Sequence, residues 1–169
     1  MEIDSSTKNF PEDSSVIQDL QLIEKHLAGT DSLRVVFRPA EVNFDKEHGG
    51  LNPLKTSKTM LGLKALQDWL EQKDGSNELS TINGLEIDKV YSPVTYLDYY
   101  RSGLERLTDD EVIRFFDDLR KKNGPKFMDD KETLLLLTLR MRVSGSSAFL
   151  DLRDSLKRII PSLLPHLKV

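Results

Sequence analysis

The side chains best suited to chemistry are three histidines and three pairs of adjacent aspartates. His26, His48 and His166 lie in three separate segments, without an i, i+4 pairing or an HExxH motif. A zinc site would require several of them to converge in space with carboxylates. We therefore interpret them as ordinary surface or capping histidines and expect no metal site.

The aspartate pairs are Asp109-Asp110, Asp117-Asp118 and Asp129-Asp130. Paired carboxylates could bind a divalent cation or divide the roles of acid and base. Two of the pairs fall where helices are predicted to begin, and acidic groups there suit the positive end of the helix dipole. The middle pair precedes Lys121 and Lys122 by four residues, which is the favourable order for ion pairs along a helix. Structural roles are therefore the favoured interpretation.

Glycine, serine and cysteine supply no recognisable catalytic or cofactor motif. Gly49-Gly50 lacks the Gly-Lys-Ser/Thr ending and the strand-to-helix context of a phosphate loop. The serines lack the context of a nucleophile elbow, and the chain contains no cysteine. The sequence therefore predicts a non-enzymatic protein without a cofactor.

Basic residues gather in the last quarter of the chain. Residues 131–169 hold 7 bases and 3 acids, whereas residues 1–50 hold 5 bases and 10 acids. The candidate anion-binding patch consists of Arg140, Arg142, Arg153, Lys157 and Arg158. Such a patch could bind nucleic acid, an anionic surface, an acidic partner protein or the acidic head of this chain. Aromatic residues suited to base stacking do not alternate with these bases, and a solvated helix face is the simplest interpretation.

A second candidate surface is aromatic. Tyr96, Tyr99 and Tyr100 lie so close together that one helix face cannot bury all of them, and Trp69 lies off the apolar stripe of its own helix. Exposed tyrosines are favoured at protein interfaces. We predict that these four residues and the long loop that contains Phe44 form a partner-binding surface.

Apolar spacing and capping signals predict about six helices, joined by turns. The clearest begins at Thr108-Asp109-Asp110-Glu111, which has the pattern of a capping box. Residues 33–37 favour an isolated strand or extended segment, and residues 81–90 favour a small β ribbon. The predicted helices cover approximately residues 13–28, 57–73, 92–107, 108–123, 129–143 and 148–160.

The stretch Asp129–Val143, which reads DDKETLLLLTLRMRV, is ambiguous. Its acidic start resembles a helix cap, whereas its second half alternates apolar and polar residues as a strand does. Length and capping favour a helix, which would form a helical hairpin with the next helix over residues 126–160. The alternative is a strand paired with Leu33–Phe37 and Leu85–Ile87, which would make the fold α+β.

Length and composition indicate one folded domain. The 169 residues are 38% hydrophobic and 31% charged, with a net charge of −4. We expect residues 1–12 to be a flexible tail and residues 13–169 to form a single helical domain. The chain has neither the run of about 20 apolar residues needed to span a membrane nor a secretory signal at its start. The absence of cysteine fits an intracellular protein, cytoplasmic or nuclear.

The sequence thus predicts an all-α fold with at most a small β ribbon. The predicted function is that of a protein–protein interaction or regulatory (adaptor) module, with another protein as its partner. The alternative is a nucleic-acid-binding protein that uses the basic C-terminal hairpin. The sequence specifies neither the partner nor the oligomeric state.

Overall fold

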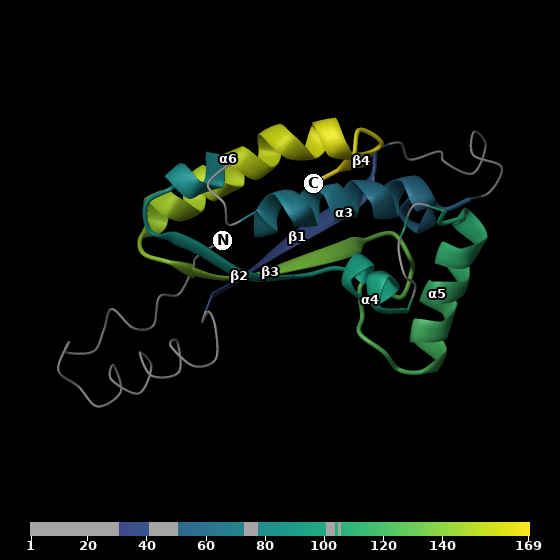
Figure 1. The fold of residues 1–169 in the computed structure, drawn as a ribbon. Coiled ribbons are helices and arrows are strands. Elements are labelled where there is room, and N and C mark those ends of the chain that lie inside the picture. The colour runs from purple at the N-terminus through teal and green to yellow at the C-terminus, as the bar shows by residue number, and fades with distance from the viewer. Residues whose placement is uncertain (1–30, 41–50, 73–77, 101–103, 105) are drawn as a thin grey trace, which may run out of the picture.

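A computed structural model of the chain describes residues 31–40, 51–72, 78–100, 104 and 106–169 (Figure 1). The elements are, in order, β1 (Asp31–Pro39), the 3-10 turn η2 (Pro53–Lys55), α3 (Ser57–Glu71), the 3-10 turn η3 (Glu78–Thr81), β2 (Leu85–Tyr91), α4 (Pro93–Tyr100), α5 (Asp109–Lys121), β3 (Leu135–Val143), α6 (Ser146–Leu163) and β4 (Leu167–Lys168).

The four strands form one antiparallel sheet in the order β2-β3-β1-β4. Helix α3 connects β1 to β2, and α6 connects β3 to β4. This order and connectivity are those of the ferredoxin-like, split β-α-β arrangement. Helices α4 and α5 form an insert between β2 and β3. Figure 1 shows α3 and α6 together on one face of the sheet, and the described part of the chain places no helix layer over much of the opposite face.

The prediction of an all-α fold is wrong, because Leu135–Val143 is the second central strand of this sheet. The odd-numbered residues of β3 from Leu135 to Met141 are buried, and the residues between them are half-buried. This period of two is that of a strand with one face on the core. Strand β3 pairs with β1 and β2, for example Leu33 with Leu139 and Ile87 with Met141. The alternative α+β interpretation had named both of these partners.

The predicted helical hairpin over residues 126–160 is wrong for the same reason. The acidic stretch that resembles a helix cap is a tight loop. Asp129 accepts hydrogen bonds at its carboxylate from the backbone N–H groups of Thr133 and Leu134, at 2.7 and 2.6 Å. Glu132 has a φ of 57°, which turns the chain into β3 instead of starting a helix. Of the two helices predicted to form this hairpin, the structure contains only α6.

Other predictions agree with the structure more closely. Helix α3 occupies the predicted segment, and the capping box of α5 is confirmed by reciprocal hydrogen bonds between Thr108 and Glu111. Helix α6 runs two residues earlier and three later than predicted, with Pro161 inside it. Helix α4 is shorter than predicted, since it ends at Tyr100. The predicted tail, the predicted first helix and the loop around Phe44 lie outside the described residues.

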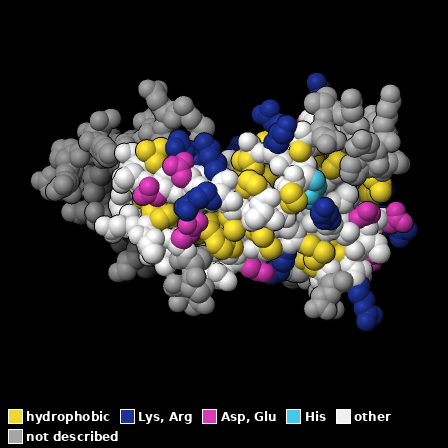
Figure 2. All heavy atoms as spheres, turned by 90° about the horizontal axis from the view of Figure 1, so that it is seen from above, with side chains coloured by type: hydrophobic (Ala, Val, Ile, Leu, Met, Phe, Trp, Pro, Cys, Tyr) yellow, Lys and Arg dark blue, Asp and Glu magenta, His cyan; other side chains and the backbone are white. Residues whose placement is uncertain are grey.

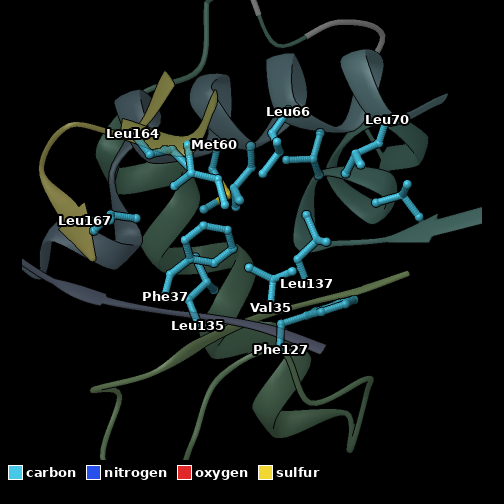
Figure 3. Packing of buried hydrophobic residues seen from close by; sticks show 14 of the residues in the cluster. Val35, Phe37, Met60, Leu66, Leu70, Phe127, Leu135, Leu137, Leu164 and Leu167 are labelled. Carbon is cyan, nitrogen blue, oxygen red and sulfur yellow. The ribbon is translucent and has the colours of Figure 1, made fainter. Parts of the chain in front are cut away.

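The core lies between the helix layer and the sheet (Figure 3). Met60, Leu66 and Leu70 of α3 point toward Phe37 of β1 and Leu137 of β3, and each of these residues is almost fully buried. Burying one such side chain contributes about 1.5–3 kcal/mol. The described helices include none that is both long enough and apolar enough to cross a membrane.

Candidate binding surface on the open face of the sheet

The face of the sheet opposite α3 and α6 is rich in basic side chains. Because side chains alternate along a strand, the residues between the buried ones point to this open face. Strand β3 contributes Arg140 and Arg142, and β1 contributes Arg34 and Arg38. Lys89 pairs with Arg140, and Lys168 pairs with Arg38, so these two lysines lie on the same face. We call these six residues the basic face.

The charges of the basic face are only partly neutralised. Arg142 forms ion pairs with Glu86 at 3.1 Å and Asp88 at 3.4 Å. Among the described residues, Arg34, Arg38 and Lys168 form no ion pair, and all three are exposed. The face therefore carries an excess of positive charge on a protein whose net charge is −4, which favours acidic ligands by electrostatic complementarity.

One aromatic ring accompanies this charge. Tyr91 pairs with Thr138, and the ammonium group of Lys89 lies 5.3 Å from the centre of the Tyr91 ring. The two central strands add Val36, Leu136 and Thr138, all half-buried, but no aromatic side chain. The face thus combines cations with a flat, mildly apolar floor.

The insert between β2 and β3 packs against one end of the sheet. The carbonyl oxygen of Phe127 accepts a hydrogen bond from the N–H of Leu136, at 2.8 Å, so Phe127 lies beside β3. The Tyr96 ring of α4 packs edge-on against Phe127, with ring centres 5.4 Å apart. Helix α4 also contacts α3, because the Thr95 hydroxyl donates a hydrogen bond to the side-chain oxygen of Gln67 at 3.3 Å. Of the basic face, Arg34, Arg38, Lys89 and Lys168 are exposed, whereas Arg140 and Arg142 are half-buried.

Two of the five aromatic residues predicted to bind a partner lie fully within the described part of the structure. Tyr96 and Trp69 are both half-buried and pack against the core. The side chains of Tyr99 and Tyr100 and all of Phe44 lie outside the described residues.

The basic residues predicted to share one hairpin lie on two different layers. Arg140 and Arg142 are on the open face of the sheet, whereas Arg153, Lys157 and Arg158 are exposed on α6. On α6 the arginines are partly neutralised, since Arg153 pairs with Asp154 at 2.9 Å and Arg158 with Glu78 at 2.8 Å. Figure 2, which views the molecule from the helix side, shows bases and acids interspersed with apolar side chains.

Sequence reasoning missed four members of the basic face: Arg34, Arg38, Lys89 and Lys168. A signal was present, because Arg34 and Arg38 are separated by an even number of residues, as Arg140 and Arg142 are. Residues at even separations in a strand lie on one face. The signal becomes meaningful only when both segments are recognised as neighbouring strands.

The charged groups with perturbed pKa values lie elsewhere, at the loop before β3. Burial raises the pKa of Glu132, but hydrogen bonds and charge from Lys55 and Arg120 outweigh it, and the pKa is lowered overall. The Lys55 ammonium group is nearly buried and lies 2.7 Å from the Glu132 carboxylate and 3.8 Å from that of Asp117. Burial likewise opposes, but does not cancel, the lowering of the Asp129 pKa by hydrogen bonds from Leu134 and Thr133.

These contacts tie the loop before β3 to η2 and α5, which is a structural role. Lys55 is held by ion pairs between the carboxylates of Glu132 and Asp117. Within the described ranges, no group of three or more histidines and carboxylates is arranged to hold a metal ion.

Comparison with protein-family models, with curated protein sequences and with solved structures found no match. Function is therefore inferred from the surface itself.

Proposed function

We propose that the protein is a non-enzymatic interaction module, an adaptor, that binds an acidic partner protein through the basic face. The single observation that carries this proposal is the excess of cations on a sheet face that no helix layer of the described residues covers. Arg34, Arg38 and Lys168 are exposed there without an ion pair within the described part of the chain. Complementary charge increases the association rate and the discrimination between partners.

A second candidate function is the binding of single-stranded nucleic acid on the same face. Tyr91 beside Lys89 supports it, because single strands are held by a basic groove with rings on which bases stack. Four-stranded sheets that bind RNA in this manner stack two or three bases on aromatic residues. On this face the central strands carry Val36, Leu136 and Thr138, none of which is aromatic. An acidic protein is therefore favoured over nucleic acid as the partner.

Charge reversal on the basic face tests the proposal. The variant Arg34→Glu/Lys89→Glu changes two exposed residues of this face, and Lys121→Glu/Lys157→Glu makes the same change of charge on α5 and α6. Binding of fluorescent polyglutamate and of single-stranded RNA would be measured at two salt concentrations. We expect the first variant to weaken polyglutamate binding by roughly tenfold and the control by less than about twofold.

Equal losses for the two variants would contradict the proposal, because the effect would then follow net charge and not the basic face. RNA binding that is tighter than polyglutamate binding, falls steeply with salt and depends on Arg34 and Lys89 would instead establish the second candidate.

A further inference from the structure

The two long edges of the sheet differ in how their backbone groups are satisfied. At the β2 edge, the N–H of Val90 donates to the carboxylate of Glu71 at 3.3 Å, and the N–H of Leu85 donates to the carbonyl of Ile82 at 3.3 Å. An irregular register between Ile87 and Lys89 also interrupts this strand. Bulges and covering side chains protect exposed edges from pairing with other chains.

Described residues cover much less of the opposite edge, that of β1. Strand β4 pairs only with Arg38 and Pro39, whereas β1 runs from Asp31. Ala40 donates its N–H to His166 on the β4 side, at 3.0 Å. Because backbone groups alternate in direction along a strand, the other even-numbered residues of β1 also point to that side. Ser32, Arg34 and Val36 therefore direct their N–H and C=O groups outward, away from β3, and no described strand pairs with them on that side.

We propose that this β1 edge binds an extended acidic segment of the partner protein as an additional strand. The inference rests on the proposed function and specifies how the partner is held. Addition of a strand to a free sheet edge supplies backbone hydrogen bonds for affinity and alternate side chains for specificity. Residues 32–36 provide three outward-directed positions for such bonds.

The chemistry of the partner follows from the side chains beside the edge. Arg34 and Arg38 lie on the open face, with Lys168 next to Arg38. An added strand places alternate side chains on that same face, where carboxylates would meet these cations. The intervening side chains would lie beside Leu33, which is half-buried, and Val35, which is buried. The segment should therefore alternate acidic and apolar residues.

A second copy of this chain fits the edge poorly. If β1 paired with its own copy through the outward-directed residues, Arg34 would lie opposite or diagonal to Arg34 of that copy. Like charges placed opposite each other destabilise a sheet. The arginines thus oppose self-association of the edge and select an acidic strand.

Amide exchange in the isolated full chain provides the first test. By NMR, the N–H groups of Ser32, Arg34 and Val36 should exchange rapidly, while those of Leu33 and Val35, which point to β3, should be protected. Equal protection of both sets would overturn the proposal, because another part of the chain or a second copy would already occupy the edge.

A capped peptide of alternating valine and glutamate provides the second test. Its addition should protect the amides of Ser32, Arg34 and Val36 from exchange. The variant Ser32→Pro removes one outward N–H from an exposed position and should weaken peptide binding by roughly three- to tenfold, whereas Ser32→Ala, which keeps that N–H, should weaken it much less. Arg34→Gln/Arg38→Gln should weaken binding and reduce its dependence on salt. If Ser32→Pro fails to fold, the protection measured in the unaltered chain decides the matter.

The outcomes separate this inference from the proposed function. Peptide binding that depends on Arg34 and Lys89 but leaves the edge amides unprotected would overturn strand addition and leave the basic face as the binding surface. A chain that binds neither this peptide nor polyglutamate would overturn both.

Discussion

At the scale of single residues, the most consequential group is the ion-pair cluster at the loop before β3. Glu132 contacts both Lys55 and Arg120, and its backbone carbonyl accepts a hydrogen bond from the Asn52 side chain at 2.9 Å. Lys55 retains only 8% of its side-chain exposure. Removing one partner of a buried pair costs more than removing both, because the remaining charge is left without compensation.

We expect Glu132→Gln to lower the free energy of unfolding by about 2–3 kcal/mol. Replacing Lys55 as well, in Lys55→Met/Glu132→Gln, should restore part of that loss. Urea denaturation of the two single variants and the double variant would measure the coupling. Strictly additive losses would show that the two side chains stabilise the fold independently.

Acidification should weaken the same cluster. The pKa values of Glu132 and Asp129 are lowered in the folded chain. Their contribution to stability is therefore complete above the unfolded pKa, near 4, and is lost as the pH falls through the lowered folded pKa. Denaturation measured between neutral and acidic pH should show a smaller decrease in stability for Glu132→Gln than for the unaltered chain. A steeper decrease in the variant would contradict this assignment.

At the scale of elements, helices α3 and α6 meet at a glycine. A Cβ atom at Gly62 would lie 2.4 Å from Cδ2 of Leu164 and 2.7 Å from the carbonyl oxygen of Leu163. Glycine costs a helix about 1 kcal/mol relative to alanine, so its presence here reflects the close approach of α6. The backbone carbonyl cannot move aside as readily as a flexible side chain.

Gly62→Ala should therefore destabilise the protein by about 1–2 kcal/mol, because overpacking outweighs the gain in helix propensity. Ala65→Gly, at an exposed position of the same helix, serves as the control and should cost about 1 kcal/mol through propensity alone. Thermal unfolding monitored by circular dichroism would measure both variants. A stabilised Gly62→Ala would mean that α6 moves away at little cost.

Strand β3 shows where prediction from sequence succeeds and where it fails. The alternation from Leu137 to Val143 was visible, and its two pairing partners could be named. Yet leucine favours helices, and the acidic residues before the strand imitate a helix cap. Whether this segment becomes a helix or a strand depends on β1 and β2, which are distant in sequence. Pairing with them overrides the local helix propensity. The capping box of α5 could be predicted because all its interactions lie within four residues.

The same reasoning applies to the candidate site. Arg140 and Arg142 were recognised as basic surface residues, but the residues beside them were not. Arg34 and Lys89 join them only through the register of the sheet. A surface assembled from four strands cannot be located until the order of the strands is known.

Because β3 is a strand, we expect the cost of substitution to alternate from one residue to the next along it. Leu137 is fully buried, and its neighbour Thr138 lies half-buried on the open face. Leu137→Ala should cost about 2–5 kcal/mol, and Thr138→Ala less than about 1 kcal/mol. Leu139→Ala should again be costly. Urea denaturation would show the period of two, and comparable losses at all three positions would argue against it.

At the scale of the whole molecule, the insert shares its core with the sheet. Val112 and Phe116 of α5 belong to the same buried cluster as Leu135 of β3 and Met60 of α3. A polar contact supports this packing, since the Asp109 carboxylate accepts hydrogen bonds from the N–H and hydroxyl of Ser57, both at 2.7 Å. Elements that share one core unfold together when neither part is stable alone.

We therefore expect one cooperative unfolding transition. Trp69, the only tryptophan of the chain, lies on α3 and reports on the sheet and its helix layer. Its fluorescence and the far-ultraviolet circular dichroism should change with the same midpoint in urea. Phe116→Ala, in the insert, should cost about 3 kcal/mol and shift both signals equally, because α5 and α3 contribute to one core. If the variant lost helical signal while Trp69 remained native, the insert would be a separate folding unit.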